Sequence, residues 1–487
     1  MTAPRRAVSV MVLGTASHVG KSLVTAAICR ILMRRGVRVA PFKAQNMSLN
    51  SAATPEGLEI GRAQALQAEA AGLAPRADMN PVLLKPFSKT GSQAIINGRI
   101  YGTLDARDFL GGTKRTFWPH VVAAYERLAS EFDVLVIEGA GSPAEINLRA
   151  GDIVNMSVAH LADARCLLVA DIDRGGAFAA VAGTMALLDE ADRSRIIAYA
   201  FNKFRGDATL LDPGIAELST RTRLACAGVV PFIDTTGLDE EDGVAKERRA
   251  RQTWRLDVDS LRVAVVALPH LANFTDFDAL EEEPEVDLIY SESPGAFSTA
   301  DVLIIPGTKD TIADLRWLRE RGIDTAIAAR AEAGAVIIGI CGGMQMLGES
   351  VDDPLGVESG GRETGLGLLP LRSSFAAQKT TIPVHGVTSA FGPPIAFDGY
   401  EIHVGVTTVE DGIGDDAVVK RERALGTYVH GLFAVDLVRH AFLRWARGLT
   451  GKPGPRVLAS VEARRAQRID ALADVVESAL DLRPLLA

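Results

Sequence analysis

A cysteine set between glycines is the residue whose surroundings most clearly predict chemistry. The apolar run 335–340 (AVIIGI) leads into Cys341, which is followed by Gly-Gly and then by a segment with helical character. Glycines on both sides permit a sharp turn that exposes the side chain, and the start of a helix stabilises a thiolate. The pattern predicts a nucleophilic thiol. The other cysteines lie inside apolar segments and are expected to be buried and inert: Cys29, Cys166 and Cys226.

A thiol nucleophile also needs oxyanion donors and a proton carrier. The backbone N–H of Gly342 is expected to face a developing oxyanion. A second donor is expected at Gly307, in the loop after the apolar run 302–305 (VLII). Among the eight histidines, His430 is the first choice of base, because it ends a short β-like run and stands beside a glycine. Two competitors also follow strand-like segments: His385 and His403.

A second chemical centre lies near the N-terminus. The apolar run 8–13 (VSVMVL) is followed by the loop 14–22, GTASHVGKS, and then by a helical pattern. Strand, glycine-rich loop and helix in this order form a phosphate site, where backbone N–H groups and the helix N-terminus face phosphate oxygens. The spacing departs from the usual motif, since five residues instead of four separate the first glycine from Gly-Lys-Ser. The residues expected to bind ATP are Gly14, Thr15, Gly20, Lys21 and Ser22.

Two further side chains follow buried strands of the same half. Glu138 comes directly after the run 134–137 (VLVI), at the carboxyl end of a strand, where ligands of open α/β sheets bind. It is expected to hold Mg²⁺ together with Ser22, although a glutamate that caps the next turn fits the local sequence equally well. Asn202 follows the run 196–201 and is a candidate for contacting the nucleotide base.

The elements that position these residues form two α/β sets. Apolar runs alternate with helical segments through the first half, which predicts a mostly parallel sheet with helices on both faces. A polar stretch at 236–260 is expected to be a linker, and a second alternating set begins at Leu261. The predicted organisation is a first domain at 1–235, the linker, a second domain at 261–450, and a helical segment at 451–487.

The composition excludes several classes of protein. The chain has 487 residues, 52 basic and 61 acidic, giving 52 − 61 = −9 at pH 7, which disfavours nucleic acid and anionic membranes as partners. Hydrophobic residues make up 47% and charged residues 23%, as in folded globular proteins. Four cysteines without C-x-x-C spacing and the lack of a long apolar segment predict a cytoplasmic protein.

The motifs together resemble those of the cobyric acid synthases. These enzymes join an ATP-dependent domain similar to dethiobiotin synthetase to a class I glutamine amidotransferase domain of the cobyrinate type. The resemblance covers nearly the whole chain and rests on many motifs in order, among them GTASHVGKS, PFKAQNMSLNS, VIEGAGSPAEINL, FNKFRGD, LPHLANFTDFD, IIPGTKDTI, GICGGMQMLG and GTYVHGLF. It implies an α/β fold with a P-loop-type N-terminal domain and an amidotransferase-like C-terminal domain.

The resemblance also implies roles for the residues. Cys341 is expected to be the nucleophile and His430 the base, and a five-residue gap is usual in loops like that of dethiobiotin synthetase. Most class I amidotransferases have a glutamate two residues after this histidine, but Leu432 stands there. A Cys–His dyad is therefore expected, and the group that orients His430 stays open.

The implied reaction is amidation of the b, d, e and g carboxylates of adenosylcobyrinic acid a,c-diamide, through an acyl phosphate and with ammonia from glutamine. ATP and Mg²⁺ are the implied cofactors, and cobalt arrives only within the corrinoid. Partners are small molecules, and the oligomeric state stays open. Candidates for corrinoid contacts are Lys43, Gln45, Asn46, Arg62 and Asn80. The alternatives are a cobyrinic acid a,c-diamide synthase and a partitioning NTPase, although the latter leaves Cys341 without a purpose.

Overall fold

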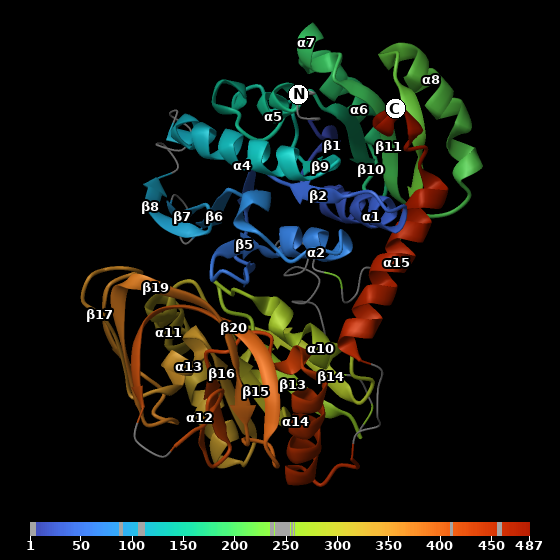
Figure 1. Cartoon of the computed structure of the whole chain (residues 1–487). Helices are drawn as coiled ribbons and strands as arrows, with labels where there is room; N and C mark the ends of the chain where they lie inside the picture. Colours follow the sequence, from blue (N-terminus) through green and yellow to red (C-terminus); the bar gives the residue numbers. More distant parts are fainter. Residues whose placement is uncertain are drawn as a thin grey trace. The chain divides into compact units, whose positions relative to one another are not determined.

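The computed structural model describes residues 6–86, 91–105, 113–233, 238, 254, 257, 259–409, 413–454 and 460–487. The chain forms two compact units (Figure 1). Unit 1 comprises Met1–Ser48, Leu58–Glu241 and Arg465–Ala487, and unit 2 comprises Leu49–Gly57 and Asp242–Arg464. Most of the predicted linker at 236–260 lies outside the described residues.

Unit 1 is built on a six-stranded sheet of order β12-β11-β10-β1-β9-β2, in which every pair is parallel. The predicted parallel sheet is therefore confirmed, and β1, β9 and β11 lie at the apolar runs 8–13, 134–137 and 196–201. Such strands read as continuous apolar runs because helices cover both faces of the sheet. The strands are β1 (Val8–Gly14), β2 (Val39–Phe42), β9 (Val134–Glu138), β10 (Arg165–Asp171), β11 (Ile196–Phe204) and β12 (Ala225–Pro231).

Helices cover both faces of this sheet. Val10 and Val12 of β1 belong to the core shared with α1 (Lys21–Arg34). Ser9 points to the opposite face, where its hydroxyl lies 3.0 Å from the hydroxyl of Tyr125 in α4 (Trp118–Glu131). Other α-helices described in unit 1 are α2 (Arg62–Ala70), α5 (Met156–Leu161), α6 (Ala177–Leu187), α7 (Glu190–Arg193) and α8 (Asp212–Thr222).

The C-terminal helix α15 (Val461–Ala479) belongs to unit 1 from Arg465 onward and packs against α1. Its buried residues Ile469, Leu472 and Val476 join the same core as α1. Each such side chain contributes about 1.5–3 kcal/mol by leaving water. Ion pairs along the contact are more exposed and contribute less: Arg30–Asp470, Arg34–Asp474 and Arg35–Glu477. The short helix α16 (Arg483–Leu486) ends the chain.

A small second sheet of unit 1 was not predicted from the sequence. It has the order β3-β6-β7-β8, and its β6–β7–β8 part is antiparallel. The strands are β3 (Gln45–Met47), β6 (Val82–Pro86), β7 (Gly91–Ile96) and β8 (Arg99–Asp105). The short strand β5 (Glu59–Gly61) leads into α2.

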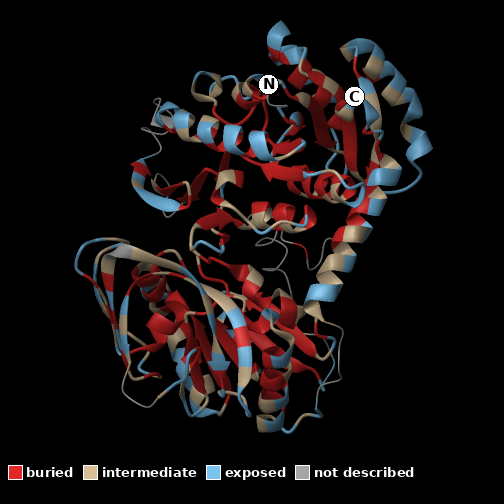
Figure 2. Ribbon diagram, viewed as in Figure 1, coloured by how far each residue is buried: buried red, intermediate tan, exposed pale blue. Residues whose placement is uncertain are grey.

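Unit 2 contains a six-stranded sheet of order β14-β13-β15-β16-β22-β21, parallel except for the edge strand β21. Figure 2 shows that the central strands of both six-stranded sheets are buried along most of their length, whereas the edge strands β12 and β21 are more exposed. The strands are β13 (Leu261–Val266), β14 (Val286–Ser291), β15 (Val302–Ile305), β16 (Val336–Ile340), β21 (Val419–Arg421) and β22 (Ala424–Thr427). The helices are α10 (Asp278–Glu281), α11 (Thr311–Glu320), α12 (Ile323–Glu332), α13 (Gly342–Leu347) and α14 (Asp436–Leu449).

A four-stranded sheet, β18-β17-β19-β20, adds to unit 2. Two long antiparallel strands dominate it: β19 (Leu371–Thr388) and β20 (Ile395–Val409). The others are β17 (Ser350–Asp353) and β18 (Gly361–Thr364). The short strand β4 (Ser51–Ala53) lies in segment 49–57 of unit 2 and is not part of this sheet. Within the described ranges, no helix is long and apolar enough to cross a membrane.

Candidate functional sites

The loop between β1 and α1 has the geometry of a phosphate site. The Thr15 N–H donates to the carbonyl of Val169 at 2.9 Å, which ties the start of the loop to the neighbouring strand β10. Gly20 precedes α1 with φ of 97°, a left-handed conformation that favours glycine. A Cβ atom at Gly20 would lie 2.2 Å from Nδ2 of Asn202. The glycine is therefore required both by its backbone angle and by the space available.

The basic side chain of this loop is held inside it. Lys21 is 2% exposed, and its ammonium donates to the carbonyls of Ala16 at 2.9 Å and Gly141 at 3.3 Å. Main-chain carbonyls pair weakly with a buried ammonium compared with anionic phosphate oxygens. The loop therefore encloses a buried ammonium whose partners in the loop are weaker than an anion would be.

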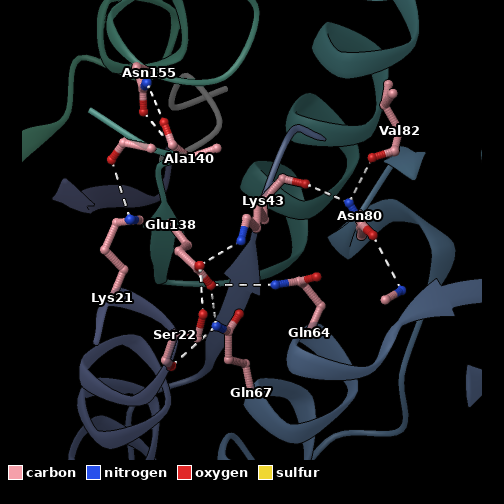
Figure 3. A network of polar contacts seen from close by, with 12 residues as sticks. Lys21, Ser22, Lys43, Gln64, Gln67, Asn80, Val82, Glu138, Ala140 and Asn155 are labelled. Atoms are coloured by element: carbon pink, nitrogen blue, oxygen red, sulfur yellow. Dashed lines mark hydrogen bonds and ion pairs between the residues drawn. The ribbon is translucent and has the colours of Figure 1, made fainter. Parts of the chain in front are cut away.

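Glu138 lies at the centre of a buried polar network in unit 1 (Figure 3). Its carboxylate is 0% exposed and accepts hydrogen bonds from Ser22 Oγ at 2.8 Å and Lys43 Nζ at 2.6 Å. The amides of Gln67 and Gln64 donate to its other oxygen at 2.5 and 3.4 Å. The carboxylate thus joins the phosphate loop to residues of α2 and of the segment after β2, instead of capping its own turn.

Of the residues expected to contact the corrinoid, Asn80 holds the main chain around it, whereas the others have different surroundings. Asn80 donates to the carbonyls of Lys43 and Val82 at 3.1 and 3.0 Å and accepts from the Gly61 N–H at 3.2 Å. Its amide therefore fixes the main chain at Lys43. Gln45 is 6% exposed, and within the described residues its Oε1 has no hydrogen-bond partner. Asn46 is also buried, and Arg62 begins α2.

Asn202 contacts the phosphate loop directly. Its Nδ2 donates to the carbonyl of Val19 at 2.8 Å, and the neighbouring Lys203 donates to the carbonyl of His18 at 2.6 Å. Both residues lie at the carboxyl end of β11, and their side chains hold the loop before α1 in place by these two hydrogen bonds. A contact between Asn202 and the nucleotide base stays a prediction.

In unit 2, Cys341 occupies a strained turn between β16 and α13. Its φ of 52° and ψ of −112° are unusual for a residue with a side chain, and such strain is typical of exposed nucleophiles. The glycines around it are required by contact. A Cβ at Gly343 would lie 2.0 Å from the carbonyl oxygen of Ile305, and one at Gly339 would lie 2.5 Å from that of Gly343. The Cys341 Sγ lies 3.5 Å from the Ile402 carbonyl oxygen.

The structure brings the two expected oxyanion residues to this turn. A Cβ atom at Gly307 would lie 3.8 Å from Cβ of Cys341 and 3.6 Å from Cε1 of His430. A Cβ at Gly342 would lie 2.7 Å from Cγ2 of Thr308, in the same loop as Gly307. The loop after β15 and the start of α13 therefore meet beside the thiol, and a side chain at Gly342 would push them apart.

His430 is held by a carboxylate that the sequence did not assign. Its Nδ1 lies 2.7 Å from Oδ2 of Asp276, and the Gly431 N–H donates to Oδ1 of Asp276 at 3.0 Å. Both side chains are buried, at 1% and 6% exposure. Burial lowers the pKa of His430, but the Asp276 carboxylate and, to a lesser degree, Cys341 outweigh it and raise this pKa above its ordinary value. The imidazole is thus oriented from Nδ1, and Asp276 stabilises the imidazolium that forms when Nε2 takes up a proton.

The two competing histidines have other surroundings. His385 is exposed and pairs with the exposed Asp398, whereas His403 stacks on Tyr428 at 3.9 Å between ring centroids. His430 stacks on Tyr400 of β20 at 5.3 Å, and its main chain exchanges hydrogen bonds with Tyr400 at 2.8 and 3.2 Å. Of the three, His430 is the one that lies beside Gly307 and a buried carboxylate.

Two family models match successive parts of the chain. The CobB/CobQ-like glutamine amidotransferase domain matches residues 262–437, and the CobQ/CobB/MinD/ParA nucleotide binding domain matches residues 10–243. Cobyric acid synthase of Moorella thermoacetica is 46% identical, covering 98% of this chain and 96% of its own length. The cobyric acid synthases of Syntrophobacter fumaroxidans and Desulforudis audaxviator are 44% and 45% identical, each covering 98% of both chains.

Proposed function

Because the chain belongs to the cobyric acid synthase family, we propose that it amidates the b, d, e and g carboxylates of adenosylcobyrinic acid a,c-diamide. It is a glutamine-dependent amidotransferase and ligase with a nucleotide-binding domain. The observation that carries the proposal is the presence of both chemistries on one chain. A buried thiol, imidazole and carboxylate cluster lies in unit 2, and a phosphate loop with a buried glutamate lies in unit 1.

Glutamine hydrolysis is assigned to Cys341, His430 and Asp276. The thiol gives its proton to Nε2 of His430, and the thiolate attacks the side-chain amide of glutamine. His430 then returns the proton to the leaving nitrogen, and ammonia departs from a glutamyl thioester. Water activated by the same imidazole hydrolyses this thioester to glutamate. The 2.7 Å contact with Asp276 supports this assignment, since it keeps a proton on Nδ1 and leaves Nε2 to face the thiol.

The oxyanion of the tetrahedral intermediate is assigned to the backbone N–H groups of Gly307 and Gly342. The support is the close approach of both glycines to the Cys341 turn. N–H groups that are already in place need no reorganisation when the negative charge develops on the oxygen. In other enzymes, removal of a single oxyanion-hole donor lowers kcat by about 10²–10³-fold. The tight packing of Gly343 against Ile305 holds the two loops at this separation.

The ATP-dependent step is assigned to unit 1. Lys21 and the backbone of the phosphate loop bind the phosphates, a substrate carboxylate becomes an acyl phosphate, and ammonia displaces inorganic phosphate to leave an amide. Ser22 and Glu138 supply adjacent hard oxygen atoms, and the amide oxygens of Gln64 and Gln67 are buried and unpartnered within the described residues. This donor set fits Mg²⁺, which supplies charge neutralisation at the phosphates when it is bound.

Lys43 is assigned a role beside the acyl acceptor. It lies within 2.6 Å of Glu138, and Asn80 fixes its main chain. A cation at this place can neutralise the substrate carboxylate or the developing charge at phosphorus. Gln45, Asn46 and Arg62 are proposed to face the corrinoid, with the buried unpartnered oxygen of Gln45 as the support.

The test is mass spectrometry of adenosylcobyrinic acid a,c-diamide incubated with the protein, ATP, Mg²⁺ and glutamine. Four successive mass decreases, each equal to the exchange of a hydroxyl for an amino group, are expected. An unchanged substrate in the presence of continuing glutamine hydrolysis would overturn the substrate assignment. Cobyrinic acid is the control substrate, because its conversion instead would identify an a,c-diamide synthase.

A further inference from the structure

Residues 49–57 form a segment of unit 2 although both of their chain neighbours, Ser48 and Leu58, belong to unit 1. This segment makes buried polar contacts with the residues beside His430. The Ser51 N–H donates to Oδ1 of Asn273 at 3.1 Å, and Oδ1 of Asn50 accepts from the Phe274 N–H at 3.2 Å. Asn50 and Ser51 are 2% and 1% exposed. The nucleotide-binding half of the sequence therefore supplies contacts inside the amidotransferase unit.

The contact with Ser51 fixes which way the Asn273 amide faces. A main-chain N–H can only donate, so the atom it meets must be the amide oxygen. The amide nitrogen then lies on the other side, 3.4 Å from Nε2 of His430. Because this nitrogen is also only a donor, it favours a His430 that carries no proton on Nε2. That form is the one able to accept the proton of the Cys341 thiol.

The contact with Asn50 fixes the turn that carries the orienting carboxylate. Asn273 has φ of 52° and ψ of 42°, and the short helix Phe274–Phe277 begins directly after it. Asn50 satisfies the first N–H of that helix, and Asp276 lies two residues further on, 2.7 Å from Nδ1 of His430. A left-handed backbone at asparagine costs conformational energy, and the first N–H groups of a helix have no partner within the helix. Hydrogen bonds from another segment therefore stabilise this turn.

We propose that Asn50 and Ser51 are positioning residues of the glutamine-hydrolysing site, which hold Asn273 and Asp276 against the two nitrogens of His430. The inference rests on the proposed function, since it assigns glutamine hydrolysis to Cys341 and His430. Asn50 and Ser51 act through the turn at 273–276. Loss of their hydrogen bonds therefore shifts the groups that orient His430 and leaves His430 itself in the chain.

The test compares Asn50→Ala, Asn50→Asp and Glu56→Ala in the full chain. Alanine removes the acceptor for the Phe274 N–H, aspartate keeps it, and Glu56 is an exposed residue of the same segment that serves as the matched control. For each variant, kcat and KM are measured for glutamine hydrolysis, and amide formation is measured with ammonia in place of glutamine. Wild type and Cys341→Ala are included in the same series.

For Asn50→Ala we expect the glutamine-hydrolysis kcat to fall about tenfold to 10²-fold, the cost of a small misplacement of a catalytic group. The KM for glutamine and the ammonia-supported rate should stay near wild type, which a misfolded protein would not show. Asn50→Asp should recover most of the rate, and Glu56→Ala should match wild type. An unchanged kcat in Asn50→Ala, or an equal loss of both activities, would overturn the inference. Glutamine hydrolysis by Cys341→Ala would instead overturn the proposed function.

Discussion

Replacing Asp276 by asparagine should impair glutamine hydrolysis through the tautomer of His430. The Gly431 N–H donates to Oδ1 of Asp276, so in the variant the amide oxygen stays on that side. The amide nitrogen is then left facing Nδ1 of His430. Since this nitrogen only donates, it requires Nδ1 to be unprotonated, and the proton moves to Nε2. An imidazole with its proton on Nε2 cannot accept the proton of Cys341.

The size of the effect follows from the geometry. Unit charges 2.7 Å apart, the distance between Nδ1 and Oδ2, interact by about 6 kcal/mol at an effective dielectric constant of about 20. A neutral carboxamide keeps part of this interaction as a dipole. A loss of about 3–5 kcal/mol in the transition state remains, which lowers kcat by about 10²–10⁴-fold.

The assay is release of glutamate at saturating glutamine, with ammonia-supported amide formation measured on the same preparation. Asp398→Asn is the matched control, because it changes an exposed carboxylate that pairs with His385 in the same unit. The control should retain full glutamine hydrolysis, and Asp276→Asn should retain the ammonia-supported reaction. A glutamine-hydrolysis rate for Asp276→Asn close to wild type would refute the tautomer argument.

Two further predictions concern other parts of the chain. Lys21→Ala should abolish ATP turnover with either glutamine or ammonia, because the buried ammonium of the phosphate loop is lost; full ATP turnover would exclude this loop as the nucleotide site. Burial raises the pKa of Glu358 from its ordinary 4.5 to about 8, so the folded chain binds a proton more tightly than the unfolded chain. Stability from this group is complete below about pH 4.5 and is lost as the pH rises through about 8. Glu358→Gln should therefore show a smaller decrease in Tm between these pH values than wild type, and an equal decrease would contradict the linkage.

The parallel strands and the two glycine-rich turns could be predicted because their signals are local. A strand buried on both faces is a continuous apolar run, as in Val134–Glu138, and a nucleophile turn or a phosphate loop is a short run of glycines after such a strand. Within the long strands Leu371–Thr388 and Ile395–Val409, only strand-like segments before His385 and His403 were recognised, because both strands face solvent on much of their length. Their polar residues interrupt the apolar pattern.

The partner of His430 could not be predicted because it comes from a distant part of the chain. Leu432 occupies the position of the usual glutamate, and it is 3% exposed and packed in the core. The carboxylate comes instead from Asp276, 154 residues earlier in the chain, at the turn after β13. The motif LPHLANFTDFD contains Asp276 and Asn273, but its spacing alone does not show which histidine they reach. The contacts of Asn50 and Ser51 with this turn are nonlocal in the same way.

Amide formation by Cys341→Ala should be measured with each nitrogen source in turn. We expect no amide from glutamine and a wild-type rate from ammonia, because the thiol serves only the release of ammonia and the phosphate loop serves only activation of the carboxylate. Loss of both reactions, or retention of both, would contradict the assignment of glutamine hydrolysis to unit 2 and ligation to unit 1.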